Sequence, residues 1–321
     1  MANIKNTYEK EPVMMREVYC NTLVELAKTN KNIVMLDADL ISSSGTKPFA
    51  KAYPERTFNC GVAEANMVGV AAGLSATGKI PFAHSFGTFA SRRCLDQIFV
   101  SAAYAQLNVR IVGSDPGVTA AYNGGTHMPF EDMASLRAIP QITLVEPTDT
   151  VMLAQIIEQL ATAYGVYYIR LQRKNAVSIY QPDSEFTIGK GVLLRQGADV
   201  TIVAAGIMVA EALKAADMLA AEGIAAEVID MFTWKPIDKE LLVQSITKTG
   251  AVVTAENHNV INGLGSAVSE VITDNCPAPL ERVGVQDLFG EVGEEPYLKE
   301  RFKLTAADIA ASAKKSIGRK K

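Results

Sequence analysis

Short runs of β-branched and other apolar residues alternate along the chain with longer segments of helical pattern. In the first half, the runs that predict strands are residues 33–36, 57–59, 80–83, 109–112 and 142–145. The segments of helical pattern in the same half are residues 63–76, 91–106 and 148–163. This alternation is typical of α/β units, in which helices connect the strands of a parallel sheet.

A polar connector that contains Arg173, Pro182 and Asp183 interrupts the alternation near the middle of the chain. Beyond it, strands are expected at residues 200–204, 225–229, 251–254 and 280–285, and helices at residues 209–222, 239–247 and 263–273. The sequence therefore predicts two α/β domains, each a mostly parallel sheet flanked by helices, over residues 1–185 and 186–321.

Composition and charge narrow the classes of function. The 321 residues are 48% hydrophobic, which is enough for a sizeable core in two domains and excludes disorder as the main state. A net charge of −4 without blocks of like charge gives no reason to expect nucleic acid or a membrane surface as a partner. The most apolar stretch, residues 200–210, is well short of the roughly 20 residues that span a bilayer.

Targeting and cysteine chemistry add little to this picture. The N-terminal segment is charged throughout and lacks the apolar core of a signal peptide. The four cysteines stand singly, without the spacing of a zinc site or a redox pair. We therefore expect a cytoplasmic protein with reduced thiols and no metal ligands of its own.

Three short segments could carry chemistry. Residues 61–67 place Glu64 at a turn from strand to helix, Phe86 and Phe89 follow a predicted strand, and a glycine-bearing loop delivers His127. Each has an ordinary explanation when taken alone. A first-turn glutamate is favoured by the helix dipole, paired aromatics commonly pack in a core, and a lone histidine in a loop is commonly a surface turn.

In this order and spacing, the three segments resemble the C-terminal half of transketolase, the pyrimidine-binding domain followed by the C-terminal domain. Further segments extend the resemblance across essentially the whole chain; these are residues 36–40, 42–44, 168–173, 255–258 and 263–266. The resemblance implies transfer of a two-carbon ketol unit from a ketose or ketose phosphate to an aldose or aldose phosphate, with thiamine diphosphate as the cofactor.

The resemblance also implies roles at the cofactor. Glu64 matches the glutamate that hydrogen-bonds the aminopyrimidine ring and promotes loss of the reactive proton. Phe86 and Phe89 match the aromatic wall against which that ring stacks. Asp39 matches an acid near the cofactor, although a turn or N-cap aspartate is an alternative interpretation.

Residues for the substrate follow from the same resemblance. His127 matches a histidine that holds the substrate and the developing alkoxide. Asn123 stands where family members have an acid that contacts a donor hydroxyl, which leaves the identity of the donor open. His84 either lines the cleft or packs. Ser114 lies near the place of a phosphate-binding histidine that this chain lacks.

A phosphate group on the substrate is bound in this family by arginine, serine and histidine side chains. Arg16, Ser43 and Arg173 match those positions. A phosphate dianion requires charge-assisted hydrogen bonds, which the planar fork of arginine donates in pairs. An arginine in a solvated or interface ion pair is the alternative interpretation for Arg16 and Arg173.

The chain lacks the family's Gly-Asp-Gly motif, which holds Mg²⁺ against the cofactor diphosphate. We therefore expect a split enzyme. An N-terminal transketolase subunit would hold the diphosphate and Mg²⁺, this chain would hold the pyrimidine end, and homodimer contacts would give an α2β2 assembly. Two alternatives remain. The segment 96–98 also resembles the beta subunit of a 2-oxo acid dehydrogenase, and a non-catalytic regulatory subunit belongs to a different class.

Overall fold

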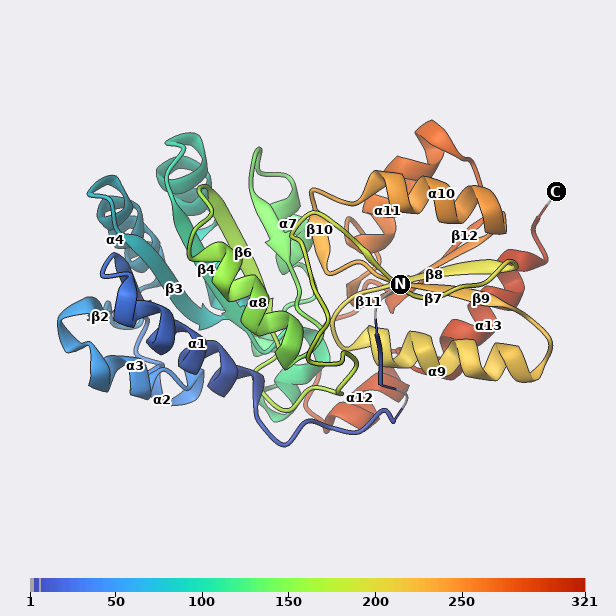
Figure 1. Cartoon of the computed structure of the whole chain (residues 1–321), viewed down its shortest axis with the longest axis horizontal. Coiled ribbons are helices and arrows are strands. Elements are labelled where there is room, and N and C mark those ends of the chain that lie inside the picture. The colour runs from blue at the N-terminus through green and yellow to red at the C-terminus, as the bar shows by residue number, and fades with distance from the viewer. Residues whose placement is uncertain (1–2, 6, 321) are drawn as a thin grey trace.

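Two sheets, one in each half of the chain, organise the structure (Figure 1). The computed structural model describes residues 3–5 and 7–320. The first sheet has seven strands in the order β10-β5-β6-β4-β3-β1-β2. Their bounds are β1 (Ile33–Asp37), β2 (Thr57–Asn59), β3 (Ile80–Phe86), β4 (Val109–Ser114), β5 (Thr143–Val145), β6 (Val166–Leu171) and β10 (Thr233–Lys235). All neighbours pair in parallel except β10 and β5.

Helices cover both faces of the first sheet, which explains why its strands are continuous apolar runs. On one face, α1 (Met15–Thr29) and α8 (Thr150–Leu160) pack over a core that includes Tyr19 and Phe82. On the other face, α4 (Glu64–Ala76) packs over a core that includes Ile111. The strands β1 and β4 are buried along their whole length.

The second sheet has five strands in the order β12-β11-β8-β9-β7, of which β7 is antiparallel to β9. The strands are β7 (Val192–Arg195), β8 (Val200–Ala204), β9 (Ala226–Asp230), β11 (Val252–Asn259) and β12 (Leu280–Val285). In Figure 1, α9 (Met208–Ala221) and α13 (Ala306–Ile317) lie below this sheet, and α10 (Lys239–Thr249) and α11 (Leu264–Asn275) lie above it. The predicted fold class is thus confirmed.

The structure departs from the predicted elements in three places. The strand β10 comes from the second half of the chain but pairs with β5 of the first sheet, so the two halves share a sheet. The helix expected over residues 91–106 is broken into α5 (Gly87–Ser91), short 3₁₀ and α-helical turns, and a π-helical segment at Ile98–Tyr104. The sequence reasoning also missed other elements, among them α1, β6, β7, β10, α12 (Glu295–Arg301) and α13. No helix among residues 3–5 and 7–320 is both long and apolar enough to cross a membrane.

A buried arginine joins the two domains. The guanidinium of Arg170, on β6, is fully buried and donates to Asp132 Oδ2 at 2.9 Å and to Glu146 Oε1 at 2.7 Å. It also donates to the backbone carbonyls of Pro129, at 3.2 Å, and of Asn257 on β11, at 2.9 Å. Because every contact is shielded from water, the network stabilises the fold only while it is complete.

Replacing Arg170 by Met should therefore destabilise the protein by at least about 3 kcal/mol, because two buried carboxylates lose their counter-charge. Urea unfolding followed by circular dichroism measures the change. The matched control is Arg195→Met. Arg195 pairs with Asp217 at 2.6 Å on the surface, where both side chains are about a third or more exposed, so this variant should lose no more than about 1 kcal/mol. Equal losses in the two variants would contradict the structural role of Arg170.

Candidate active site

The carboxyl ends of four adjacent strands, β6, β4, β3 and β1, bring candidate residues to one edge of the first sheet. Arg173 follows β6, Asp115 follows β4, Phe86 ends β3, and Ser43 lies shortly after β1. In open parallel sheets, ligands bind outside the carboxyl ends of the strands. The topology therefore gathers residues from distant parts of the sequence at the expected place for a site.

Glu64 is the first residue of α4, and its side chain is buried next to this edge. Ser85 Oγ, on β3, donates to Glu64 Oε1 at 2.9 Å. Arg93 Nη1 donates to Glu64 Oε2 at 2.9 Å. The start of a helix favours a carboxylate, and hydrogen bonds from both sides fix its orientation.

An aromatic cluster lies beside the buried glutamate. The ring of His127 packs edge-on against Phe89 at 5.1 Å between centroids and against Phe86 at 6.0 Å. Phe86 and Phe89 are 6.2 Å apart and tilted by 47°. A short turn, Gly125–His127, presents the histidine, whose Nδ1 lies 2.9 Å from Thr126 Oγ1. The structure thus brings together three residues that the sequence had placed in two separate segments.

Sequence reasoning missed the functional position of Arg93. Its guanidinium carbon lies 3.8 Å from the centroid of the Phe89 ring while Nη1 donates to Glu64. A signal was present, because Arg93 follows Phe89 by four residues, a spacing that places two side chains on one face of a helix. Arg93 therefore links the aromatic ring of Phe89 to the carboxylate of Glu64.

This contact tests whether the residues fit the cofactor that the family implies. An aminopyrimidine ring is flat and needs a stacking surface and a carboxylate at its edge. The guanidinium of Arg93 is also flat, and it uses the same two features: it stacks on the ring of Phe89 and donates to the carboxylate of the buried Glu64. The side chains of this chain therefore fit the pyrimidine end of thiamine diphosphate.

Two arginines converge on α2 (Ile41–Ser44), the short helix that follows β1. Arg16 Nη1 donates to the backbone carbonyl of Ser43 at 2.9 Å, and Arg173 Nη1 donates to the same oxygen at 3.3 Å. Arg173 also forms an ion pair with Asp115, and its guanidinium carbon lies 5.2 Å from the Phe86 ring centroid. The three residues predicted for a substrate anion are thus adjacent to one another and to the aromatic cluster.

The remaining predicted residues lie differently. Asp39 is exposed, has a φ of 64°, and exchanges hydrogen bonds with Asn59 in a turn, at 3.0 and 3.1 Å. Asn123 is exposed at the end of a 3₁₀ segment. No hydrogen bond within the described part of the chain joins Asp39 or Asn123 to Glu64, Arg173 or His127.

His84 is fully buried on β3, behind the site. Its ring packs edge-on against Tyr19 at 5.3 Å, and neither ring nitrogen has a hydrogen-bond partner among the described residues. Burial, and to a lesser extent the charge of Arg173, lowers the pKa of His84 to about 3. The imidazole is therefore neutral at physiological pH, and it lies against α1 rather than at the surface.

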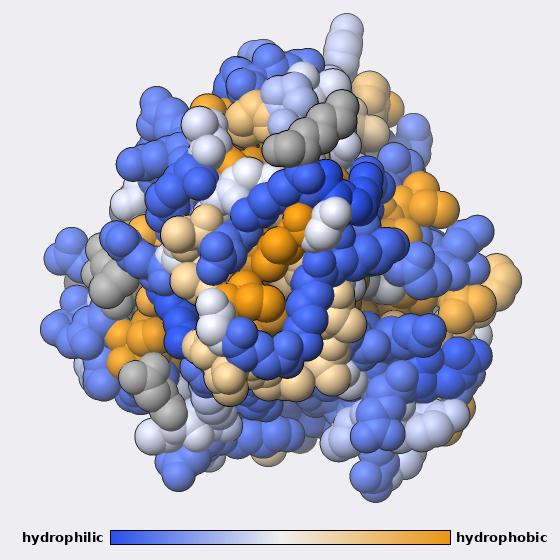
Figure 2. Space-filling model, turned by 90° about the vertical axis from the view of Figure 1, so that its right-hand side faces the viewer, coloured by the Kyte–Doolittle hydropathy of each residue, from blue (hydrophilic) through white to orange (hydrophobic). Residues whose placement is uncertain are grey.

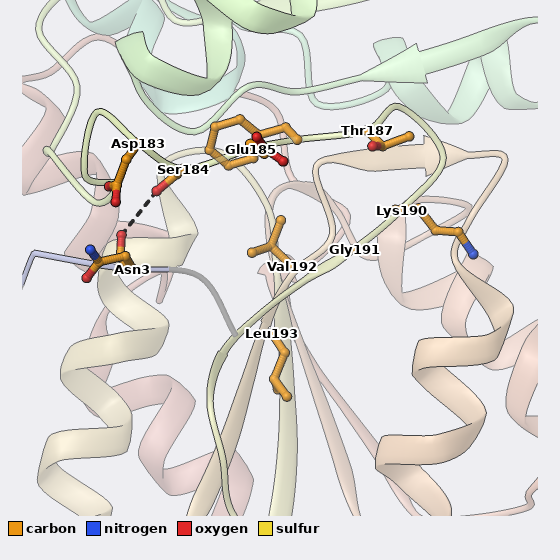
Figure 3. A pocket seen from close by; sticks show the side chains of 10 residues that line it. Asn3, Asp183, Ser184, Glu185, Thr187, Lys190, Gly191, Val192 and Leu193 are labelled. Carbon is orange, nitrogen blue, oxygen red and sulfur yellow. Dashed lines mark hydrogen bonds between the residues drawn. The ribbon is translucent and has the colours of Figure 1, made fainter.

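A separate cavity of about 490 Å³ lies between the connector and β7. Residues 183–187 and 190–193 line it, as Figure 3 shows. In the same view, Ser184 Oγ donates to the backbone carbonyl of Asn3 at 3.1 Å. On the face seen in Figure 2, hydrophilic side chains surround a hollow with a hydrophobic floor. The cavity between the connector and β7 contains none of the residues gathered at the strand ends, so it is distinct from the candidate active site.

The two-sheet fold is that of a pyrimidine-binding domain followed by a C-terminal domain, as found in thiamine diphosphate enzymes. Residues 11–177 match the family model for the transketolase pyrimidine-binding domain. Residues 189–309 match the model for the transketolase C-terminal domain. The chain belongs to the transketolase family.

Several relatives align with nearly the whole chain. A 6-deoxy-6-sulfo-D-fructose transketolase subunit of Clostridium sp. (strain MSTE9) is 55% identical over 95% of both chains. A subunit of the apulose-4-phosphate transketolase of Phocaeicola vulgatus is 36% identical over 86% of this chain and 88% of its own. The solved structure of a split gene transketolase, an inactive beta4 tetramer, is 48% identical with a TM-score of 0.90 and covers 96% of this chain and 100% of its own. The resemblance to the C-terminal part of transketolase is confirmed.

The buried state of His84 predicts an acid-sensitive contribution to stability. The unfolded chain binds a proton at His84 near pH 6.5, whereas the folded state resists it until about pH 3, so stability falls as pH drops below 6.5. Replacing His84 by Phe removes this loss. Relative to the parent protein, the variant should gain about 2 kcal/mol in the free energy of unfolding between pH 7 and pH 5. Urea unfolding at both pH values measures it, and a difference that does not change with pH would contradict the prediction.

Proposed function

We propose that this chain is the catalytic C-terminal subunit of a split transketolase, which transfers a two-carbon ketol unit from a ketose donor to an aldose acceptor. The observation that carries the proposal is the convergence of Glu64, Phe89 and His127 at the carboxyl end of β3. Thiamine diphosphate, when bound, supplies the nucleophilic carbon and the electron sink that break the carbon–carbon bond.

The residues of this chain hold and orient the reacting groups. Glu64 would form the hydrogen bond to the edge of the pyrimidine ring, and Ser85 fixes the orientation of the carboxyl group by donating to Oε1. Arg93 must release Phe89 and Glu64, or share them, when the ring binds. His127 lies against the same aromatic wall and can donate a hydrogen bond to a substrate oxygen that gains negative charge.

A partner subunit completes the site in this proposal. The sequence has no Gly-Asp-Gly motif, and the described residues contain no group of three or more His, Cys, Asp or Glu side chains that could hold a metal ion. A diphosphate with Mg²⁺ needs oxygen ligands in close array, so an N-terminal subunit must supply them. The solved relative supports this arrangement, because its assembly of beta subunits alone is described as inactive. We propose an α2β2 enzyme.

The donor is proposed to be a ketose with an anionic group at its far end. Arg16 and Arg173, next to the aromatic wall, support this class of substrate. The names of two relatives, one acting on a sulfonated ketose and one on a ketose phosphate, favour a specialised substrate. Asn123 replaces an acid of the family pattern, and an amide both donates and accepts hydrogen bonds, which is consistent with an altered donor.

Replacing Glu64 by Gln tests the catalytic role. We expect kcat of the reconstituted enzyme to fall by roughly 100-fold or more, because an amide cannot take part in the proton transfer. Ketol transfer is measured with a coupled assay of the released aldose. The control Glu25→Gln removes a surface carboxylate that pairs only with Lys28 in the structure, at 2.6 Å, and should retain full activity. Unchanged turnover in the Glu64 variant would refute the mechanism.

The requirement for a partner is tested by titrating the isolated chain with thiamine diphosphate and Mg²⁺ in a calorimeter. We expect weak binding and no turnover until an N-terminal transketolase subunit with the Gly-Asp-Gly motif is added. Size-exclusion chromatography with light scattering should then show a complex of both subunits. Tight cofactor binding and full turnover by this chain alone would contradict the split architecture. Turnover of a 2-oxo acid with a lipoyl acceptor would instead identify a dehydrogenase subunit.

A further inference from the structure

We propose that Asp115 sets the charge of the substrate's anion subsite, so that the enzyme prefers a donor ending in a singly charged oxyanion, such as a sulfonate, over one ending in a phosphate dianion. This inference rests on the proposed function and makes its substrate class more specific. It follows from the way in which Asp115, Arg173, Arg16 and Ser43 meet at the ends of β4, β6 and β1.

Asp115 occupies the fork of Arg173. Arg173 Nε donates to Asp115 Oδ1 at 3.0 Å, and Nη2 lies 2.9 Å from Oδ2. The remaining terminal nitrogen, Nη1, donates to the backbone carbonyl of Ser43. The edge formed by Nε and Nη2 is the one with which arginine binds phosphate through two parallel hydrogen bonds. An incoming anion therefore meets a guanidinium whose bidentate edge already binds a carboxylate.

The position of Asp115 is held by the protein around it. Its side chain is 1% exposed, although aspartate is almost never buried unless it is paired. Its φ is 59°, in the left-handed region that aspartate and asparagine adopt more readily than other residues with side chains. Its backbone N–H donates to the carbonyl of Leu171, at 3.1 Å, which fixes the residue at the end of β4.

The charges around the subsite sum to a small positive value. Arg16 and Arg173 contribute two positive charges and Asp115 contributes one negative charge, which leaves one. Lys174 is exposed at the rim, and His84, behind Arg173, is neutral. A sulfonate carries one negative charge, whereas a phosphate monoester carries nearly two at pH 7 because its second pKa is about 6. The buried and half-buried groups of the subsite thus balance the single charge of a sulfonate. For the second charge of a phosphate, only the solvated ammonium of Lys174 remains.

The carboxyl group must be ionised for this effect. Burial raises the pKa of Asp115, and the charges of Arg173, Lys174 and Arg16 oppose that rise. The ion contacts at 2.9 and 3.0 Å join both carboxyl oxygens to a guanidinium, which is the geometry of a charged pair. The proposal therefore takes Asp115 and Arg173 as an ion pair.

The test uses the reconstituted enzyme and two ketohexose donors that differ only at C6, one carrying a sulfonate and the other a phosphate. In the parent enzyme at pH 7.5, kcat/KM should favour the sulfonate. Asp115→Asn keeps the shape and tolerates a positive φ, but removes the charge. In this variant the ratio of the two kcat/KM values should shift toward the phosphate by roughly 10- to 100-fold.

Two controls separate specificity from structure. A residue that only braces Arg173 would change kcat/KM for both donors by the same factor. Asp115→Gly, which suits the positive φ, should shift the ratio in the same direction as Asp115→Asn. Asp217→Asn removes the carboxylate of the surface pair with Arg195, which joins α9 to β7 of the second sheet, and should leave the ratio unchanged.

A second readout varies the charge of the substrate instead of the protein. Between pH 7.5 and pH 5.5 the phosphate donor becomes largely a monoanion while the sulfonate does not change. At the lower pH, the ratio of kcat/KM for the sulfonate to kcat/KM for the phosphate should therefore fall in the parent enzyme, and the same ratio should rise in Asp115→Asn. An unaltered ratio in both Asp115 variants, or a parent enzyme that prefers the phosphate at pH 7.5, would overturn the inference while leaving the proposed function intact. Absence of turnover with both donors would overturn the proposed function and the inference together.

Discussion

The buried guanidinium of Arg170 is the interaction on which the arrangement of the molecule depends. It binds two carboxylates and two backbone carbonyls in the buried interior, and these groups come from both domains. One carbonyl belongs to Pro129, two residues after His127, and the other belongs to Asn257 on β11. Asn257 in turn accepts from the backbone N–H of Val118 and donates to the carbonyl of Pro116. The loop that presents His127 is therefore anchored to the second domain, and the position of His127 depends on the contact between the domains.

The contact of Arg93 with Phe89 and Glu64 shows how half of a cofactor site can exist without the cofactor. A buried carboxylate is costly unless it has a partner, and Arg93 provides one from a partly exposed position. The same interaction offers the ring of the cofactor a flat surface and an acceptor, both already in place. A chain that waits for a second subunit thus keeps its buried charge paired, and binding exchanges one flat donor for another.

The sequence predicted most strands to within a few residues, because buried parallel strands are short apolar runs bounded by turns. It also placed Glu64, Phe86, Phe89 and His127 near strand ends, since those positions follow from local order. It could not predict β10, whose three residues show no periodicity and whose pairing crosses the domain boundary. The breaks in the helix after Phe89 were missed because residues 91–106 keep a helical pattern without a proline or glycine to mark an interruption. The pairs Arg93–Glu64 and Arg173–Asp115 join residues 29 and 58 positions apart, a separation at which only the folded sheet determines contact.

Both Glu64 and Arg173 are held in arginine–carboxylate pairs, although one is an anion and the other a cation. In the proposed function, the carboxylate of Glu64 serves the cofactor and Arg93 balances its charge until a ligand binds. In the proposed anion subsite, Arg173 serves the substrate and Asp115 limits its charge. An arginine–carboxylate pair can serve both purposes, because either partner can keep part of its hydrogen-bonding capacity for a ligand. The order β6-β4-β3-β1 places Arg173 and Asp115 side by side at two adjacent strand ends, next to the aromatic wall of β3. Substrate charge and cofactor orientation are therefore both consequences of one sheet topology.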